Sequence, residues 1–309
     1  MHRETLTARS VDTTRAVGVL GATSFLGRRL LERLQAPDPP GAETSAAGRR
    51  LFAFTRAAAA TPDASGRVRW RRFPIDHATW RETIPHWVAV CPLWAVPEHF
   101  PLLEASGARR LVALSSTSRF TKRESTDAAE RSLAARLAAA EDEVIAAARA
   151  RGIVATIFRP TMIYDGSHDR NVTAIAAFIR RYRFFPVVGA AAGLRQPVHA
   201  DDVVAACETA LARDGETDAY ELSGGEILSY REMVRRIFLW LGRPPRLLTV
   251  PVPLVRPLGI VPVVGSLSAK AVRMNDDLVF DHAPAARDFG FAPRPFVLPL
   301  RRAALHARG

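Results

Sequence analysis

Lysine is almost missing from this 309-residue sequence, because Lys122 and Lys270 are the only two in the chain. The formal net charge is nevertheless +12, so arginine supplies almost all of the positive charge. Such a surplus favours anionic partners such as phosphates, nucleotides or acidic lipid surfaces. The basic residues are scattered or paired and no nucleic-acid-binding module accompanies them, so we expect a solvated basic surface and no nucleic acid partner.

Cysteine is equally scarce. Cys91 and Cys207 are too few for a disulfide framework, which indicates a reducing compartment, and we expect the cytoplasm. Residues 1–15 are polar and lack the apolar core of a secretory signal, so we interpret them as a flexible tail. We assign no metal ligands.

A long unbroken apolar run is also absent. Residues 247–269 are rich in apolar side chains, but prolines and Arg256 interrupt them, whereas a spanning helix needs about 20 largely unbroken apolar residues. We therefore predict a buried loop-and-helix region here. Contact with a membrane surface is the lesser alternative.

Short β-rich runs alternate with helical patterns in the first half of the chain. This alternation predicts an α/β fold, a Rossmann-like doubly wound parallel sheet whose ligand lies beyond the carboxyl ends of the strands. Beyond residue 160 the helical periodicities are separated by glycine and proline, which predicts a smaller C-terminal substrate lobe. The predicted strands are 16–20, 51–55, 68–73, 87–90, 110–115 and 153–158, and the predicted helices are 26–35, 97–106 and 127–151. The predicted domains are a flexible tail over 1–15, a nucleotide-binding domain over 16–160, and substrate-lobe segments over 161–309, interleaved with the last strands of the sheet.

The longest predicted helix, over residues 127–151, raises the question of whether it does chemistry or only packs. Asp127 with Glu130 offers an N-cap pair, and Gly152 offers a stop. One apolar stripe runs along it at helical spacing, made of Leu133, Leu137, Ala140 and Val144.

The segment GATSFLG, residues 21–27, follows the first predicted strand and opens the first helix. In the dinucleotide fingerprint the first glycine makes the tight turn, the second lets the backbone approach the pyrophosphate, and the third permits close packing of helix on strand. Here Gly21 and Gly27 hold the outer positions and Ser24 the middle one. Serine is small and its hydroxyl can donate to a phosphate, so Gly21, Ser24, Phe25, Leu26 and Gly27 are the predicted cofactor turn. The alternative is a turn without a ligand.

Arg56 ends the second predicted strand, where the adenosine ribose would lie. An acidic residue there would favour NAD, whereas an arginine can hold a 2′-phosphate, so we expect NADP in preference to NAD. In a chain this rich in arginine, chance placement is the alternative. Asp76, Cys91 and Ser115 are further predicted cofactor contacts, although for Cys91 a small buried hydrophobe is the favoured alternative.

Six segments carry a resemblance to a known family: GATSFLG (21–27), RLVALSST (110–117), IFRPTMIYDG (157–166), LRQPVHADDV (194–203), YELSGGEILSYREM (220–233) and DFGFAPRP (288–295). Through them the chain resembles the extended and atypical short-chain dehydrogenases, the NAD-dependent epimerase/dehydratase family. The resemblance implies a nicotinamide cofactor, often a nucleoside-diphosphate sugar above it, and a homodimer. It also implies hydride transfer with a proton exchanged by a tyrosine whose pKa a nearby lysine lowers.

Position by position, the resemblance implies roles for residues of this chain. Thr117 matches the hydroxyl that assists the tyrosine, with Ser116 as the adjacent alternative. The loop that flanks the nicotinamide is matched by Pro160, Thr161 and Met162. The implied substrate contacts, or supports for them, are Asn171, Arg195, His199 and Asp202.

The family's Tyr-x-x-x-Lys pair is missing. Aligning Glu141 places its tyrosine and lysine at Leu133 and Leu137, and neither lysine of the chain has a tyrosine four positions before it. Leucine has no proton to give, and an arginine such as Arg136, with a pKa above about 12, is a poor proton relay. Ser132 and Arg136 could still face the cofactor; the alternative is a solvent-facing pair.

Two residues of the loop IYDGSHDRN are the predicted substitutes. His168 has the right unperturbed pKa for acid–base work, and Tyr164 lies nearby in the sequence. A surface histidine and a structural tyrosine are the alternatives. The leading hypothesis is an NADP(H)-binding oxidoreductase or epimerase acting on a nucleoside-diphosphate sugar or similar small anionic substrate. Its alternative is a non-catalytic NADPH-binding scaffold or redox-sensing subunit.

Overall fold

The computed structural model describes residues 16–36, 49–56, 66–213, 215–255 and 273–298. The predicted tail at 1–15 and the end of the apolar region 247–269 lie outside these residues.

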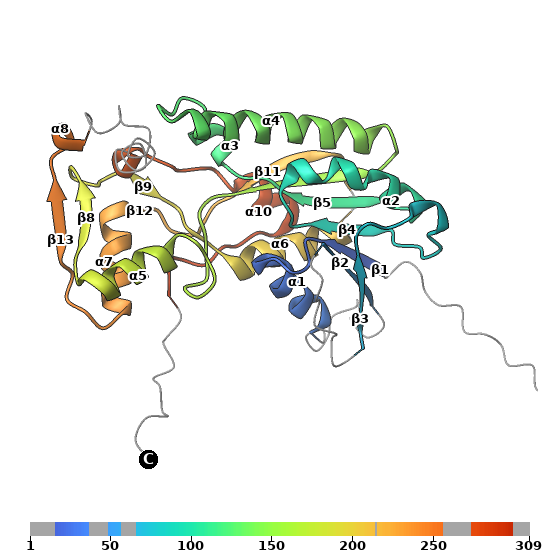
Figure 1. Ribbon diagram of the computed structural model, residues 1–309, viewed down its shortest axis with the longest axis horizontal. Helices are drawn as coiled ribbons and strands as arrows, with labels where there is room; N and C mark the ends of the chain where they lie inside the picture. Colours follow the sequence, from blue (N-terminus) through green and yellow to red (C-terminus); the bar gives the residue numbers. More distant parts are fainter. Residues whose placement is uncertain (1–15, 37–48, 57–65, 214, 256–272, 299–309) are drawn as a thin grey trace, which may run out of the picture.

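Seven parallel strands form one sheet in the order β11-β6-β5-β4-β1-β2-β3 (Figure 1). Strands such as β1 are buried along their whole length, which is why their sequences are continuous apolar runs rather than alternating ones. The order reverses between β1 and β4, and this reversal creates the crevice in which such folds bind ligands. The predicted α/β fold is thereby confirmed. The strands are β1 (Ala16–Leu20), β2 (Arg50–Thr55), β3 (Val68–Arg72), β4 (His86–Ala89), β5 (Arg110–Leu114), β6 (Val154–Pro160) and β11 (Asp218–Leu222).

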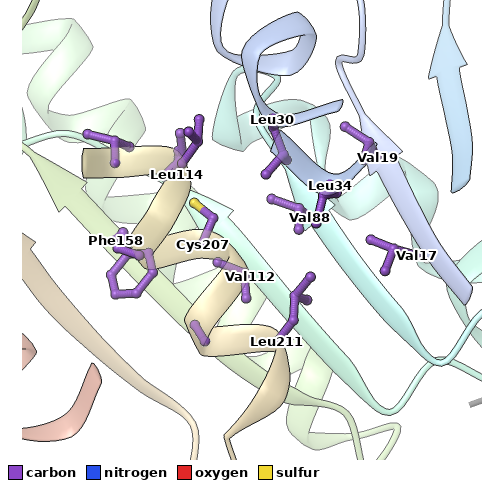
Figure 2. Packing of buried hydrophobic residues seen from close by; sticks show 14 of the residues in the cluster. Val17, Val19, Leu30, Leu34, Val88, Val112, Leu114, Phe158, Cys207 and Leu211 are labelled. Carbon is purple, nitrogen blue, oxygen red and sulfur yellow. The ribbon is translucent and has the colours of Figure 1, made fainter. Parts of the chain in front are cut away.

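Helices cover both faces of the sheet. On one face lie α1 (Phe25–Gln35), α6 (Ala200–Ala212) and α10 (Ala283–Phe289); on the other lie α2 (Phe100–Ala105) and α4 (Ala128–Arg149). Figure 2 shows Leu30 and Leu34 of α1 and Cys207 and Leu211 of α6 packed over the valines of the central strands. Each such side chain stabilises the fold by about 1.5–3 kcal/mol when fully buried. Four short helices complete this part: η2 (His77–Thr79), η3 (Leu93–Ala95), η4 (Pro97–His99) and α3 (Ser118–Thr121).

A second lobe lies at the left of Figure 1, away from the large sheet. Its helix α5 (Val172–Tyr182) buries Val172, Ile175 and Ile179, at the spacing of one helical face, against α7 (Tyr230–Trp240). Three two-stranded ribbons surround these helices: β8 (Phe185–Val188) with β13 (Leu247–Val250), β7 (Ile163–Tyr164) with β10 (Val198–His199), and β9 (Leu194–Arg195) with β12 (Leu228–Ser229). The remaining short elements are α8 (Val252–Val255) and η6 (Arg273–Asn275).

The prediction for residues 247–269 is wrong where the structure describes them. Residues Leu247–Val250 form the strand β13, which pairs with β8, and only the short helix α8 follows. Leu248 is 56% exposed and Leu254 is 65% exposed, so this is not a buried loop-and-helix region. Pairing with β8 holds β13 in place, and Leu248 and Thr249 of this strand are exposed.

Helix α4 begins and ends where its sequence predicts, but its N-cap differs in detail. Asp127 accepts the N–H of Ala129 at 2.8 Å, and Gly152 adopts a left-handed φ of 64° beyond the last turn. Glu130 does not complete a reciprocal pair. Its carboxylate accepts the Ser125 hydroxyl at 2.7 Å and an Arg273 N–H at 2.8 Å, because Arg273 brings a charge that a backbone amide cannot match.

Candidate functional site

A cavity of about 270 Å³ opens at the carboxyl ends of β1, β2 and β4. This is the crevice beside the reversal of strand order, where the sequence predicts a ligand. The cavity is lined by residues that include Gly21, Ser24, Arg56, Phe73, Cys91 and His99.

Gly21, Thr23 and Ser24 of the glycine turn line this cavity, whereas Phe25, Leu26 and Gly27 do not, and the two glycines of the turn are sterically required. Gly21 has a φ of +78°, and a Cβ there would lie 2.7 Å from the backbone nitrogen of Cys91. A Cβ at Gly27 would lie 2.4 Å from the carbonyl oxygen of Gly21. Ser24 caps α1 by accepting the N–H of Gly27 at 3.0 Å, which leaves the proton of its hydroxyl for donation.

The opposite wall is aromatic and carries a positive charge at its rim. The ring of His99 stacks on Phe73 with 4.5 Å between the ring centroids. Burial lowers the pKa of His99, and the neighbouring Arg56 lowers it further, while Glu98 acts in the opposite direction. His99 is therefore neutral near pH 7, and Arg56 is the cationic side chain of the wall.

Two further predicted cofactor residues are placed differently. Cys91 lines the cavity, and burial raises the pKa of its thiol to about 11. Asp76 is exposed, and its carboxylate caps η2 by accepting the N–H of Ala78 at 3.0 Å. The structure thus brings Cys91 to the cavity and commits Asp76 to a local turn.

The hydroxyls predicted for the nicotinamide end follow β5. Thr117 is buried and donates to the carbonyl oxygen of Pro160 at 3.3 Å, so it lies beside the loop with which the resemblance pairs it. Ser116 accepts the N–H of Ser118 at 3.1 Å, and Ser115 donates to Glu141. The same loop continues through Thr161, which donates to the Gln196 carbonyl, and Met162, which packs on the second lobe's core.

Glu141 is the centre of an ion cluster that the sequence analysis missed, since it used this residue only to align α4. Its side chain is fully buried and accepts from Arg119 and from Arg159, the latter at 2.6 Å. Arg159 also contacts Glu221 at 3.0 Å. Burial alone would lower the pKa of Arg159, but the hydrogen bonds and negative charges of Glu141 and Glu221 together outweigh that effect and raise it. The sequence signal that could have revealed this cluster is an acidic residue, Glu141, on the buried side of a predicted helix.

Helix α4 carries the two leucines to which the resemblance assigns the family's catalytic pair. Leu137 is 5% exposed and packs inside, and Leu133 is half-buried. Arg136 and Ser132 are exposed, and the Arg136 guanidinium lies 4.1 Å from the centre of the Trp94 ring. Helix α4 therefore packs against the core of the large sheet and contributes Glu141 to the buried ion cluster.

The loop after β7 does not offer a free phenol. Tyr164 is fully buried, donates to the Pro295 carbonyl at 3.2 Å and accepts the N–H of Val297 at 3.1 Å. Burial raises the pKa of this tyrosine. His168 has a largely exposed ring that stacks near Phe25, with centroids 6.1 Å apart, so the loop lies beside the start of α1. This geometry favours a packing role for Tyr164.

Asp165 anchors that loop to α1. Burial alone would raise the pKa of Asp165, but hydrogen bonds from His168, Ser167 and Asp169 outweigh it and lower the pKa to about 2. Arg29 of α1 contacts Asp165 at 2.9 Å and also contacts Asp201 of α6. The helix that follows the glycine turn is therefore tied by charge to the second lobe.

The four predicted substrate residues do not line the described cavity. Asn171 is exposed at the start of α5. The buried Arg195 donates to the carbonyls of Asp276 and Arg273. His199 caps α6 by accepting the N–H of Asp201 at 3.1 Å, and Asp202 pairs with Arg294 at 2.8 Å. Three of the four therefore hold the chain together, and their substrate role stays a prediction.

Two kinds of site are absent from the part of the chain that the structure describes. No group of three or more His, Cys, Asp or Glu side chains there could hold a metal ion. No helix there is long and apolar enough to cross a membrane.

Parts of the chain are similar to a known protein family and to a known protein. The model of the NAD dependent epimerase/dehydratase family matches residues 100–223, which include β5, α4, β6 and β11. Over these residues the chain is similar to that family. The mitochondrial NADH dehydrogenase (ubiquinone) 1 alpha subcomplex subunit 9 of Arabidopsis thaliana is 30% identical over 156 residues. That match spans 45% of this chain and 38% of the relative's length, so well under half of the relative is represented.

Solved structures of other proteins share the fold. The UDP-N-acetylglucosamine 4-epimerase of Bacillus cereus superposes with a TM-score of 0.66 at 13% identity, covering 90% of this chain and 91% of that one. MoeE5, in complex with UDP-glucuronic acid and NAD, gives a TM-score of 0.65 at 18% identity over 91% of this chain and 94% of that one. At these identities the likeness shows the fold alone.

Proposed function

We propose that this chain holds NADP(H) in the cavity beside the glycine turn and serves as a cofactor-holding or redox-sensing subunit rather than as a tyrosine-dependent epimerase. One observation carries the proposal. The end of the fold that would receive the nucleotide has the two outer glycines and a cavity, while α4 buries Leu137, the residue to which the resemblance assigns the family's lysine.

The residues present fit a dinucleotide. Gly21 and Gly27 leave room that a Cβ would fill, and Ser24 keeps a hydroxyl proton for a phosphate. Arg56 supplies a fixed positive charge for a 2′-phosphate, which favours NADP over NAD. A bound nicotinamide would supply hydride; this chain's residues would bind the nucleotide and exclude water from it. The named Arabidopsis relative, a subunit of an NADH dehydrogenase, supports the role of a subunit.

An oxidoreductase or epimerase acting on a nucleoside-diphosphate sugar is the second candidate. The specific observation in its favour is the position of Thr117, whose hydroxyl lies beside Pro160 at the end of β5. The structure of MoeE5 with UDP-glucuronic acid and NAD supports the same class of small anionic substrate. The proton donor for such chemistry would have to come from outside α4, with His168 as the exposed candidate.

The test is nucleotide affinity, measured on the full chain by the fluorescence of NADPH and NADH. We expect Arg56→Ala to weaken NADPH binding by roughly tenfold or more and to leave NADH binding nearly unchanged, because a charge-assisted hydrogen bond contributes about 1.5–3 kcal/mol. Arg149→Ala, an exposed arginine at the end of α4, is the matched control and should change neither affinity.

Three results would count against this assignment. Failure to bind either dinucleotide would overturn the proposal, and an equal loss of both affinities in Arg56→Ala would remove the 2′-phosphate role. Oxidation of NADPH on addition of a uridine or thymidine diphosphate sugar would favour the second candidate. The domain division at residue 160, the cytoplasmic location and the homodimer stay predictions.

A further inference from the structure

Five arginines gather at one end of the second lobe. Arg180, Arg181 and Arg183 end α5, while Arg243 and Arg246 lie between α7 and β13. Hydrogen bonds to backbone carbonyls join the two segments. Arg243 donates to the carbonyl of Ile179 at 3.3 Å, and the N–H of Phe185 donates to the carbonyl of Arg246 at 2.9 Å. We call these five arginines the basic pole; it lies at the end of the lobe where α5 and α7 meet the β8–β13 ribbon (Figure 1).

No carboxylate neutralises the basic pole. Residues 170–200 and 233–275, which supply the whole of it, contain no aspartate or glutamate. Among the residues that the structure describes, none of the five has a carboxylate oxygen within 4.0 Å, whereas arginines elsewhere, such as Arg29 and Arg236, contact two each. The positive charge of this surface is therefore left for an external anion.

Stabilisation of α5 by its own macrodipole explains only part of this arrangement. Cations in the last turn of a helix are favourable, and this accounts for Arg180 and Arg181. Arg183 is the C-cap residue of α5, with a left-handed φ of 64°, so its charge also lies at this helix end. Arg246 is exposed in the segment before β13 and has no helix end to stabilise.

Large apolar side chains are exposed among these arginines. Tyr182 is 54% exposed and lies between Arg181 and Arg183 in the chain. Leu248 of β13 is 56% exposed and follows the exposed Arg246 by two residues. Leu239, near the end of α7, is 51% exposed. Exposed apolar side chains beside unneutralised arginines are typical of a surface that meets both headgroups and acyl chains.

We propose that the basic pole docks this protein on an anionic lipid bilayer, with Tyr182, Leu239 and Leu248 entering the headgroup region. Arginines near such a surface are attracted by its negative potential, and tyrosine is favoured at the boundary between water and lipid. A nucleic acid would attract the same arginines, but Leu239 and Leu248 would gain nothing from a phosphate backbone. The proposal is independent of nucleotide binding, because the basic pole shares no residue with the lining of the cavity.

Vesicle co-sedimentation of the full chain tests the proposal. We expect binding to vesicles of phosphatidylcholine mixed with phosphatidylglycerol, falling as salt is raised, and little binding to phosphatidylcholine alone. The variant R181Q/R183N/R246Q should lose affinity on the order of a hundredfold, since each arginine near the surface contributes about fivefold. Asparagine is used at position 183 because it tolerates the left-handed backbone there.

A matched control removes the same number of charges elsewhere. Arg123, Arg149 and Arg287 are exposed and lie outside the second lobe, and R123Q/R149Q/R287Q should bind the anionic vesicles within about fivefold of the parent chain, since its charges lie far from the docked surface. A second pair, Y182S/L248S, keeps every charge and should weaken binding roughly tenfold through lost apolar burial.

Several outcomes would overturn the proposal. Equal binding of the parent chain to neutral and anionic vesicles would remove the electrostatic argument. If R123Q/R149Q/R287Q lost as much affinity as R181Q/R183N/R246Q, binding would depend on overall charge and not on the basic pole. Binding to a single-stranded oligonucleotide without binding to the anionic vesicles would assign the basic pole to nucleic acid instead.

Unchanged NADPH affinity and unfolding temperature in R181Q/R183N/R246Q would show that any loss of vesicle binding is local.

Discussion

Replacing Glu141 by glutamine tests whether the buried ion cluster beside β5 stabilises the fold. Glu141 is fully buried, and the change leaves Arg119 without a carboxylate partner among the described residues. Arg159 keeps Glu221. Removing one member of a buried ion pair costs about 3–5 kcal/mol. Because the side chains of Arg119 and Arg159 remain 24% and 14% exposed, solvent screens them and the lower end of that range, about 3 kcal/mol, is expected.

Urea unfolding measured by fluorescence gives this free energy directly, and the midpoint temperature should fall by roughly 6 °C or more. Glu143→Gln is the matched control, since Glu143 is exposed on the same helix and its loss should change stability by less than about 0.5 kcal/mol. A loss below about 1 kcal/mol for Glu141→Gln, or a loss equal to that of the control, would refute the reasoning.

Two further predictions concern ionisation. The pKa of Asp165 in the folded chain, about 2, lies below its usual 3.8, so its contribution of about 2 kcal/mol is present above pH 5 and lost as the pH falls toward 2. Asp165→Asn should therefore flatten the dependence of unfolding free energy on pH between 5 and 3, and parallel curves would contradict this. Cys91, with a pKa of about 11 against 9.0 for a free thiol, should react with iodoacetamide at pH 8 about a hundredfold more slowly in the native chain than in urea. Mass spectrometry of the modified peptide measures both rates, and native labelling within tenfold of the unfolded rate would count against the buried thiol.

The elements of the nucleotide-binding half could be predicted because their signals are local. The apolar run at 16–20, the glycine turn at 21–27 and the N-cap at Asp127 each fix backbone conformation within a few residues. All six predicted strands and the long helix are confirmed within a few residues of their predicted ends. Local sequence is sufficient there because burial on both faces demands continuous apolar strands.

The contacts between distant segments could not be predicted in the same way. The resemblance assigns Arg195 to the substrate, yet its guanidinium donates hydrogen bonds to backbone carbonyls that lie 78 and 81 residues away in the chain. Glu130 has the spacing of a capping residue, but Arg273 attracts it more strongly. In both cases the partner that decides the role comes from a remote part of the chain, and a single sequence does not reveal such pairings.

The seventh strand has a consequence for how this chain folds. β11 pairs with β6 only after the chain has travelled through α5, β8 and α6, and the hydrogen bond between Ala155 and Thr217 closes a loop of 62 residues. Forming that edge requires the chain entropy of the whole excursion to be lost before the strand pairs, which slows folding relative to a protein built from local contacts. A chain cut after residue 160 would leave β6 as a bare apolar edge strand, a template for aggregation. Completion of the large sheet therefore depends on a segment that follows most of the second lobe in the chain.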